Sequence, residues 1–230
     1  MQPYFFPYLG YFDLINRCDK FIVLDTPQYI RQGWMNRNRI LHPRHGWQYV
    51  MVPVKRHRLG TAINQIETIL PTSWRPRILG QLMHYKRTAP FFRNTFQLVE
   101  ACLAAETTSL LALNIHILGL VSARLGIRWQ HEVFSSMRLD LQSAKTPGEM
   151  AVRMAIVLGA DEFINRPGGA NQFDRAKFEA HGIKLTIQPS FEFTYATPGY
   201  TFEPGLSVID ALMWNSPEVI KAHLDAQRTK

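Results

Sequence analysis

Residues 146–189 read TPGEMAVRMAIVLGADEFINRPGGANQFDRAKFEAHGIKLTIQP, and this stretch decides the fold class. EFIN at 162–165 and KLTIQP at 184–189 are short apolar runs of the kind that form buried strands. Apolar residues at three- and four-residue spacing predict helices over 147–158 and 173–181. Helices and strands that alternate over short links predict βαβ units and a parallel sheet.

The rest of the chain extends this pattern outward. KFIVLD at 20–25 predicts another buried strand, and a helix is expected before it over 8–17. The segments 34–41 and 47–54 flank HPRHG and predict a β-hairpin. Further elements are expected as a strand over 128–134 and helices over 74–87, 91–105, 109–125, 208–214 and 217–227. The expected N-caps are Ser73 for the helix over 74–87, Thr108 or Ser109 for the helix over 109–125, and Thr146 for the helix over 147–158.

These elements add up to one architecture. We expect an α/β protein with a mostly parallel sheet, flanking helices, a β-hairpin and a helical insertion. The length fits a single domain over 1–230, with 73–126 as the helical insertion or subdomain.

The composition is that of an ordinary globular protein. Of the 230 residues, 46% are apolar and 19% are charged, which excludes disorder, collagen and coiled coil. The two cysteines make no disulfide framework and favour a reducing compartment. No run of about 18 apolar residues occurs, and the first residues lack the features of a signal peptide. We therefore expect a cytoplasmic protein without a membrane span.

The positive charge is concentrated in one part of the chain. Residues 26–99 hold twelve basic residues and one acidic residue, a net charge of +11, whereas the remainder carries −3. A field of this kind attracts anions, such as a phosphate-bearing small molecule or an acidic carrier protein, although a solvated basic surface explains it equally. The basic residues do not follow the spacing of nucleic-acid-binding motifs, so no nucleic-acid partner is expected.

Three segments carry chemistry, and each has a purely structural alternative. The first is QPYFFPYLGYF at 2–12, whose aromatic rings can stack a base or a sugar and whose Tyr4 and Tyr11 hydroxyls can bind a ligand. The alternative is an aromatic cluster that seals one end of the domain. Its loop-before-helix arrangement is that of the H-x-G-H loop of nucleotidylyltransferases, but Tyr8 and Tyr11 stand where that loop has its histidines.

The second segment is GWMNRNRI at 33–40. Strand alternation predicts that Trp34, Asn36, Asn38 and Ile40 share one face and that Met35, Arg37, Arg39 and Leu41 share the other. Two arginines on one face can hold a phosphate or a carboxylate.

The third segment is NRPGGANQFD at 165–174, which follows a strand and precedes a helix. Gly168 and Gly169 permit positive φ and close approach of the backbone, and Asn171 lies in the same turn. The next helix offers free N–H groups to an anion. A tight structural turn is the alternative.

Two residues are candidate general bases. Asp25 follows a buried strand at the end where α/β sheets bind ligands, and His84 lies on a predicted helix beside Lys86. No metal-ligand spacing, catalytic triad motif or nucleotide-cofactor motif is present, so we expect no metal and no cofactor.

Five segments, taken in order, carry a resemblance to a known family. They are QPYFFPYLGYFDLI (2–15), PQYIRQGWMNRNRI (27–40), KRTAPFF (86–92), LGADEFINRPGGANQFD (158–174) and LSVIDALMWN (206–215). The chain resembles the WbqC-like protein family over nearly its whole length. The family pattern maps onto Gln2, Pro3, Tyr4, Pro7, Gly10, Tyr11, Gln28, Tyr29, Trp34, Asn36, Arg37, Asn38, Arg39, Gly168, Gly169 and Asp210.

The resemblance implies a role in bacterial surface-polysaccharide (O-antigen) assembly, with glycine transfer suggested for members. We expect a transferase that adds an aminoacyl, for example glycyl, or acyl group to a sugar, without a covalent enzyme intermediate. A non-catalytic module that binds a nucleotide-sugar or a carrier protein, and a divergent nucleotidylyltransferase-like enzyme, stay as alternatives.

The family implies one more expectation, about the start of the chain. Members usually begin with a short apolar strand before Gln-Pro, whereas here Met1 directly precedes Gln2. We therefore expect a gap in the sheet beside residues 20–25, and expect residues 2–7 to be poorly anchored or covered by another chain.

Overall fold

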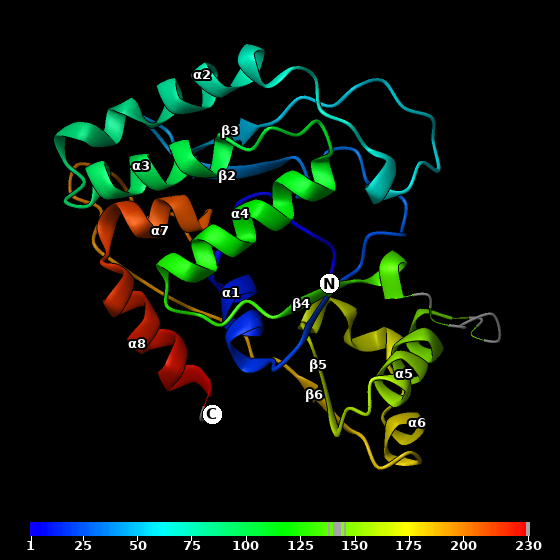
Figure 1. The fold of residues 1–230 in the computed structure, drawn as a ribbon. Helices are drawn as coiled ribbons and strands as arrows, with labels where there is room; N and C mark the ends of the chain where they lie inside the picture. Colours follow the sequence, from blue (N-terminus) through cyan, green and yellow to red (C-terminus); the bar gives the residue numbers. More distant parts are fainter. Residues whose placement is uncertain (138, 140–143, 145, 229–230) are drawn as a thin grey trace.

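A computed structural model describes residues 1–137, 139, 144 and 146–228 (Figure 1). The helices are α1 (Leu9–Arg17), α2 (Pro71–Leu82), α3 (Phe92–Leu103), α4 (Leu110–Arg124), α5 (Pro147–Val157), α6 (Arg175–Glu179), α7 (Val208–Trp214) and α8 (Pro217–Arg228), with 3-10 turns η1 (Ile63–Gln65), η2 (Met83–Arg87), η3 (Phe134–Met137) and η4 (Pro167–Gln172). The strands are β1 (Phe21–Val23), β2 (Arg37–Leu41), β3 (Trp47–Met51), β4 (His131–Val133), β5 (Glu162–Asn165) and β6 (Lys184–Ile187).

The strands pair two by two. β1 and β4 are parallel, β5 and β6 are parallel, and β2 and β3 form the expected antiparallel hairpin. The α/β class is therefore confirmed. The sheet is smaller than expected, because the two parallel pairs do not join into one continuous sheet within the described part of the chain.

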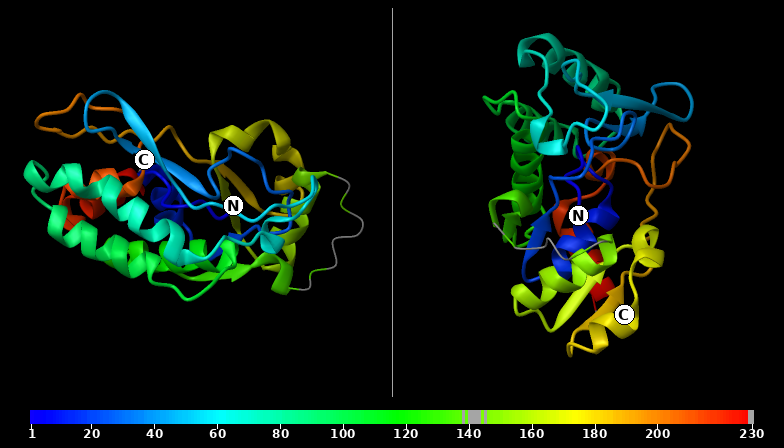
Figure 2. Two further views of the ribbon diagram at one scale, coloured as in Figure 1. Left: turned by 90° about the horizontal axis from the view of Figure 1, so that it is seen from above. Right: turned by 90° about the vertical axis from the view of Figure 1, so that its right-hand side faces the viewer.

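Of the three hydrophobic clusters among the described residues, the two larger ones define a large and a small lobe. The large core gathers α1, α3, α4, α7, α8 and the β2–β3 hairpin. The small core lies where α5 and α6 pack on β5 and β6, around Phe178 and Leu185. Figure 2 shows the β5–β6 pair and its helices at one end of an elongated molecule.

The helices over 71–124 follow the sequence pattern closely, except at the start of α2. Ser109 caps α4 by accepting a hydrogen bond from the amide of Ala112, as expected. The expected cap Ser73 is wrong, because α2 already begins at Pro71, and the Ser73 hydroxyl donates to the Leu70 carbonyl from inside the first turn. Proline at the first helical position, where no N–H donor is needed, explains the earlier start. The delimitation of this block as an insertion stays a prediction.

The amino-terminal segment is firmly held, so the expected poor anchoring of residues 2–7 is wrong. Phe5 and Phe6 are fully buried, and the amide of Phe5 donates to the carbonyl of Trp34. Phe6 has a positive φ of 39°, which is strained for a bulky residue. The Asn38 amide and the Ser207 hydroxyl both donate to the Phe6 carbonyl and hold this conformation in place.

The two edges of β1 have different partners. One edge of β1 pairs with β4, and the other edge pairs only with Met1, through bonds from the Met1 amine to the Ile22 carbonyl and from the Leu24 amide to the Met1 carbonyl. Among the described residues, no strand pairs with this edge beyond Met1.

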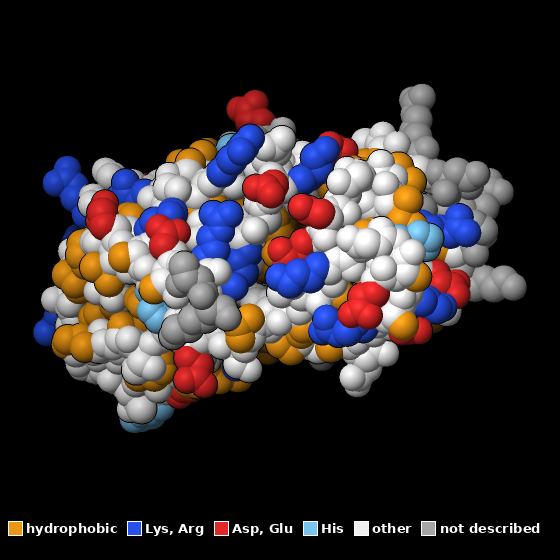
Figure 3. Space-filling view, turned by 90° about the horizontal axis from the view of Figure 1, so that it is seen from below, with side chains coloured by type: hydrophobic (Ala, Val, Ile, Leu, Met, Phe, Trp, Pro, Cys, Tyr) orange, Lys and Arg blue, Asp and Glu red, His pale blue; other side chains and the backbone are white. Residues whose placement is uncertain are grey.

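Two further properties concern the surface. No helix within the described ranges has both the length and the apolar character that crossing a bilayer requires. On the face of the molecule seen from below, basic and acidic side chains are interspersed (Figure 3).

Candidate functional site

A cleft of about 750 Å³ separates the two lobes. β1 supplies Ile22 to its wall from the large lobe, and Leu24 follows that strand. Met154 of α5 and Ile164 of β5 line it from the small lobe. The cleft is large enough for a ligand of nucleotide-sugar size, and its lining mixes apolar side chains with charged ones such as Arg17, Lys20 and Glu162.

Predicted ligand-binding residues meet at one end of this cleft. Gln2, Tyr4, Trp34, Gly168 and Gly169 all line it, at the end where β1 and β5 finish. Arg166, which directly follows β5, lines the same end. We call these six residues the mouth of the cleft. Open α/β folds bind ligands at the carboxyl ends of their strands, and the mouth has that position.

Arg166 is the cationic group of the mouth. Its guanidinium lies 4.7 Å from the centroid of the Tyr8 ring, and its Nε is buried without a hydrogen-bond partner among the described residues. Burial raises the pKa of the Tyr4 and Tyr8 hydroxyls, and the Arg166 charge opposes that shift. Both hydroxyls therefore stay protonated and can donate to an anion.

A second group of predicted residues gathers on the outward face of the hairpin. The Arg39 guanidinium lies 5.4 Å from the Trp34 ring and 5.1 Å from the Trp47 ring. The Arg37 guanidinium lies 4.1 Å from the Tyr49 ring. We call Trp34, Arg37, Arg39, Trp47 and Tyr49 the arginine–aromatic face. Trp34 belongs to both the face and the mouth.

The predicted alternation of residues 34–41 is correct only inside the strand. Arg37 and Arg39 face outward, opposite to the buried Asn38. The placement of Trp34 with the asparagines is wrong, as is that of Met35 with the arginines: Trp34 packs beside Arg39, and Met35 is buried. The strand begins only at Arg37, so the period-two rule does not apply to the turn before it.

The two asparagines of this segment bind backbone groups. The Asn36 side chain donates to the Val52 carbonyl at 2.9 Å, and the Asn38 side chain donates to the carbonyls of Phe5 and Phe6. Both are buried. Asn36 ties together the two ends of the hairpin, and Asn38 holds the hairpin against the amino-terminal segment that supplies Gln2 and Tyr4 to the mouth.

Asp25 is buried, and its carboxylate is engaged by two neighbours. It accepts hydrogen bonds from the Asn64 amide at 3.0 Å, from the Ser135 hydroxyl at 2.6 Å and from the Ser135 backbone at 3.0 Å. These bonds tie the loop after β1 to the end of β4. Asp25 does not line the cleft, although Leu24 before it does.

His84 lies away from the mouth, in η2. Tyr200 donates its hydroxyl proton to the His84 carbonyl, so we assign the ring proton to Nδ1, which donates to the Tyr200 oxygen at 3.0 Å. Burial lowers the pKa of His84 to about 4, so the ring is neutral near pH 7. Asp210 lies next to this group and accepts hydrogen bonds from the hydroxyls of Tyr85 and Tyr195.

The remaining predicted residues do not reach the mouth. Gln28 is exposed and forms a bridge with Ala62, and Asn171 is exposed outside the cleft lining. Tyr11 is buried, and its hydroxyl donates to the Gln2 carbonyl at 2.7 Å. Gly168 and Gly169 do not use the positive φ that glycine permits, because the seven glycines with positive φ among the described residues lie elsewhere.

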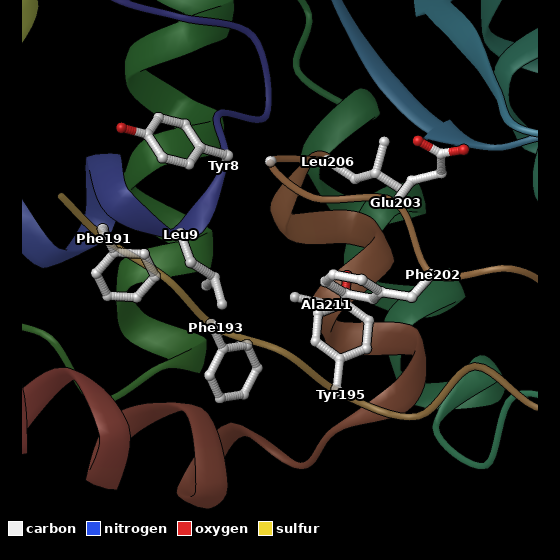
Figure 4. A pocket seen from close by; sticks show the side chains of 10 residues that line it. Tyr8, Leu9, Phe191, Phe193, Tyr195, Phe202, Glu203, Leu206 and Ala211 are labelled. Atoms are coloured by element: carbon white, nitrogen blue, oxygen red, sulfur yellow. The ribbon is translucent and has the colours of Figure 1, made fainter.

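A second cavity is much smaller. Its volume is about 40 Å³, and aromatic rings dominate its lining. Figure 4 shows Tyr8 and Phe191 on one side and Tyr195 and Phe202 on the other. It has room for about one or two water molecules, so the 750 Å³ cleft is the candidate ligand site.

Sequence reasoning missed three residues of these groups. Arg166 lies within the turn at 165–174, where the sequence-based prediction names Gly168, Gly169 and Asn171 instead. Trp47 and Tyr49 alternate along the second hairpin strand, and their alternation predicts one shared face. In the structure Tyr49 is the cross-strand partner of Arg39, and Trp47 lies next to it on the same face.

The fold and the cleft define an α/β protein that presents basic and aromatic side chains at the carboxyl ends of its parallel strands. The sequence profile of the WbqC-like protein family matches residues 2–222, and the chain belongs to that family. It is 30% identical over 219 residues to "Uncharacterized protein Rv1507c" of Mycobacterium tuberculosis (strain ATCC 25618 / H37Rv), covering 92% of this chain and 90% of the relative. No solved structure matches the chain.

Proposed function

We propose that the protein is a transferase of bacterial surface-glycan assembly, which adds an aminoacyl, for example glycyl, or acyl group to a phosphate-bearing sugar held in the cleft. The observation that supports this most is the mouth, where five predicted binding residues surround Arg166. The Arg166 guanidinium, the Tyr4 hydroxyl and the exposed indole of Trp34 are suited to a phosphorylated sugar.

The transfer we propose is direct. The amine or hydroxyl of the sugar attacks the carbonyl carbon of an activated donor such as a carrier-protein thioester. A C–N or C–O bond forms, the C–S bond breaks, and the acceptor proton ends on the departing sulfur. Holding both reactants in one cleft contributes most of the rate enhancement.

The cysteines support a direct route over a covalent enzyme intermediate. Cys18 lines the cleft, and burial raises the pKa of its thiol to about 11; burial raises that of Cys102 to about 12. A thiol that stays protonated at neutral pH is a poor nucleophile. Both cysteines are free, which fits the cytoplasmic location we propose.

The alternative with an observation in its favour is a non-catalytic binding module. Of the two candidate bases, Asp25 has both carboxylate oxygens engaged, and His84 lies outside the cleft. We assign Asp25 a positioning role, because it fixes the chain that follows β1 beside the mouth.

Turnover and binding separate the two functions. The native protein, mixed with a glycyl or acyl thioester and a nucleotide-sugar, is expected to give a mass-shifted sugar product. Arg166→Gln is expected to weaken nucleotide-sugar binding at least tenfold. Arg153→Gln, on α5 outside the cleft lining, is the matched control and is expected to bind like the native protein. Binding without product would favour the module, and unchanged binding in Arg166→Gln would contradict the proposed site.

A further inference from the structure

The arginine–aromatic face places its two guanidiniums against aromatic rings. Arg39 contacts the two indole rings, at 5.4 Å and 5.1 Å from their centroids, and Arg37 lies over a phenol ring. The Trp47 and Tyr49 rings also contact each other edge to face at 5.0 Å. A guanidinium stacked on aromatic rings keeps its N–H groups free at its edge, where they can bind an oxyanion in the plane.

These guanidiniums have donors to spare. Arg37 donates to the Gln32 carbonyl, and Arg39 donates to the Gly205 carbonyl at 3.4 Å. The Nε of each arginine is buried, so the terminal amino groups are the donors available to a ligand, and neither arginine forms an ion pair with any described carboxylate. Residues two apart on a strand are separated by about 6–7 Å, a distance over which two guanidiniums can reach two linked phosphates.

The same face offers aromatic surface to solvent. Trp34 is 38% exposed and Trp47 is 40% exposed, which is unusual for the largest apolar side chain. Exposed indole faces beside cationic groups are suited to stacking a nucleobase. Figure 2 shows the hairpin beside the segment that precedes α7. Gly205 of that segment contacts Arg39 through its carbonyl oxygen, which lies 3.4 Å from Nη2.

The face is continuous with the mouth of the cleft. Trp34 packs beside Arg39 on the face and lines the cleft together with Tyr4 and Arg166. A ligand that lies across Trp34 can therefore contact both groups at once.

We propose that the arginine–aromatic face binds the nucleoside diphosphate part of the substrate, with the phosphates on Arg37 and Arg39 and the base stacked on Trp47. This rests on the proposed function, because it takes the sugar part to lie at the mouth. The substrate class is therefore a nucleoside-diphosphate sugar, in preference to a simple sugar phosphate.

Calorimetric titration of the native chain tests this, with ADP, UDP, inorganic pyrophosphate, adenosine and uridine as probes. We expect at least one nucleoside diphosphate to bind, and its nucleoside to bind at least tenfold more weakly. Arg39→Lys, which keeps the charge and loses the planar fork, is expected to weaken diphosphate binding at least tenfold. Trp47→Leu is expected to weaken nucleotide binding at least fivefold and to leave pyrophosphate binding unchanged. The control is Arg44→Gln, an exposed residue of the hairpin loop outside the face, which is expected to bind like the native chain.

Three results would overturn the proposal: no binding of either nucleoside diphosphate, native affinity in both Arg39→Lys and Trp47→Leu, or pyrophosphate binding as tight as that of the nucleotides.

Turnover assays distinguish failure of this proposal from failure of the proposed transferase function. Nucleotide binding that depends on Arg39 and Trp47, without any transfer product, supports the face and contradicts the transferase. Transfer from or to a nucleotide-sugar with an unchanged KM in both variants contradicts the face and supports the transferase.

Discussion

Polar residues in or beside the strands have different roles, depending on whether their side chains are already paired with other groups of the protein. Asp25 and Asn38 are buried with their side chains bonded within the chain, whereas Arg37, Arg39 and Arg166 form no ion pair with a described carboxylate. The sequence shows both groups alike, as polar residues in or beside apolar strands. Only the packed structure separates residues that hold the site together from residues available to a ligand.

Replacing Asp25 is expected to act through stability. Asp25→Ala leaves the Asn64 amide and two Ser135 donors without their acceptor, and we expect the free energy of unfolding to fall by about 2–4 kcal/mol. Ser135→Ala removes one of these bonds and is expected to cost about 1 kcal/mol. Urea unfolding measures both. A loss below about 0.5 kcal/mol in Asp25→Ala would contradict the positioning role.

His84 is expected to make stability depend on pH. Burial lowers the pKa of His84 from 6.5 to about 4 in the folded chain, so the unfolded chain binds more protons between these values. The contribution of His84 to stability is therefore fully present above about pH 6.5 and is lost progressively as pH falls toward 4. Thermal unfolding from pH 4 to 8 should show a shallower decline for His84→Gln than for the native chain. Parallel curves would mean that His84 titrates normally when folded.

At the scale of elements, the sequence predicted what local signals encode. The strand at 162–165 is found with those bounds, Thr146 caps α5, and Gly126 ends α4 with a positive φ of 66°. These features depend on neighbours in sequence. The division of the sheet into pairs and the gathering of the mouth depend on contacts across more than 100 residues, for which local pattern carries no signal.

The joint between α5 and η4 is a tertiary contact within the small lobe, and it depends on Gly148. A Cβ at this position would lie 2.1 Å from the Gln172 carbonyl oxygen, so the two backbones touch here. Gly148→Ala is expected to destabilise the chain by about 1–3 kcal/mol, although the same change usually favours a helix. Gly168→Ala is the control, because a Cβ there meets nothing within 4 Å, and its change should stay within about 0.5 kcal/mol. Equal melting temperatures for the two variants would show that α5 and η4 move apart at this contact without loss of stability.

At the scale of the whole molecule, function depends on how firmly the small lobe is held. Its own core contains six buried residues, whereas 36 buried residues form the large core. Two side-chain contacts join the lobes near the mouth: Gln188 donates to the Gly10 carbonyl and to Asp13, and Arg166 lies over Tyr8. A lobe with a small core and few ties opens at a lower free energy than the rest of the chain.

Native-state hydrogen exchange measures this difference directly. Amides of β5 and β6 are expected to exchange through an opening that costs less free energy than the global unfolding that releases the amides of α4. Because the mouth draws residues from both lobes, a nucleotide-sugar bound there stabilises only the closed arrangement. Adding the nucleotide-sugar at 100 Kd should slow amide exchange in β5 and β6 by up to about a hundredfold. The slowing in α4 should be smaller. Arg166→Gln should remove this selective protection, while Arg153→Gln should keep it. Equal slowing in β5, β6 and α4 would mean that the lobes open only together and that the cleft does not gate access to the site.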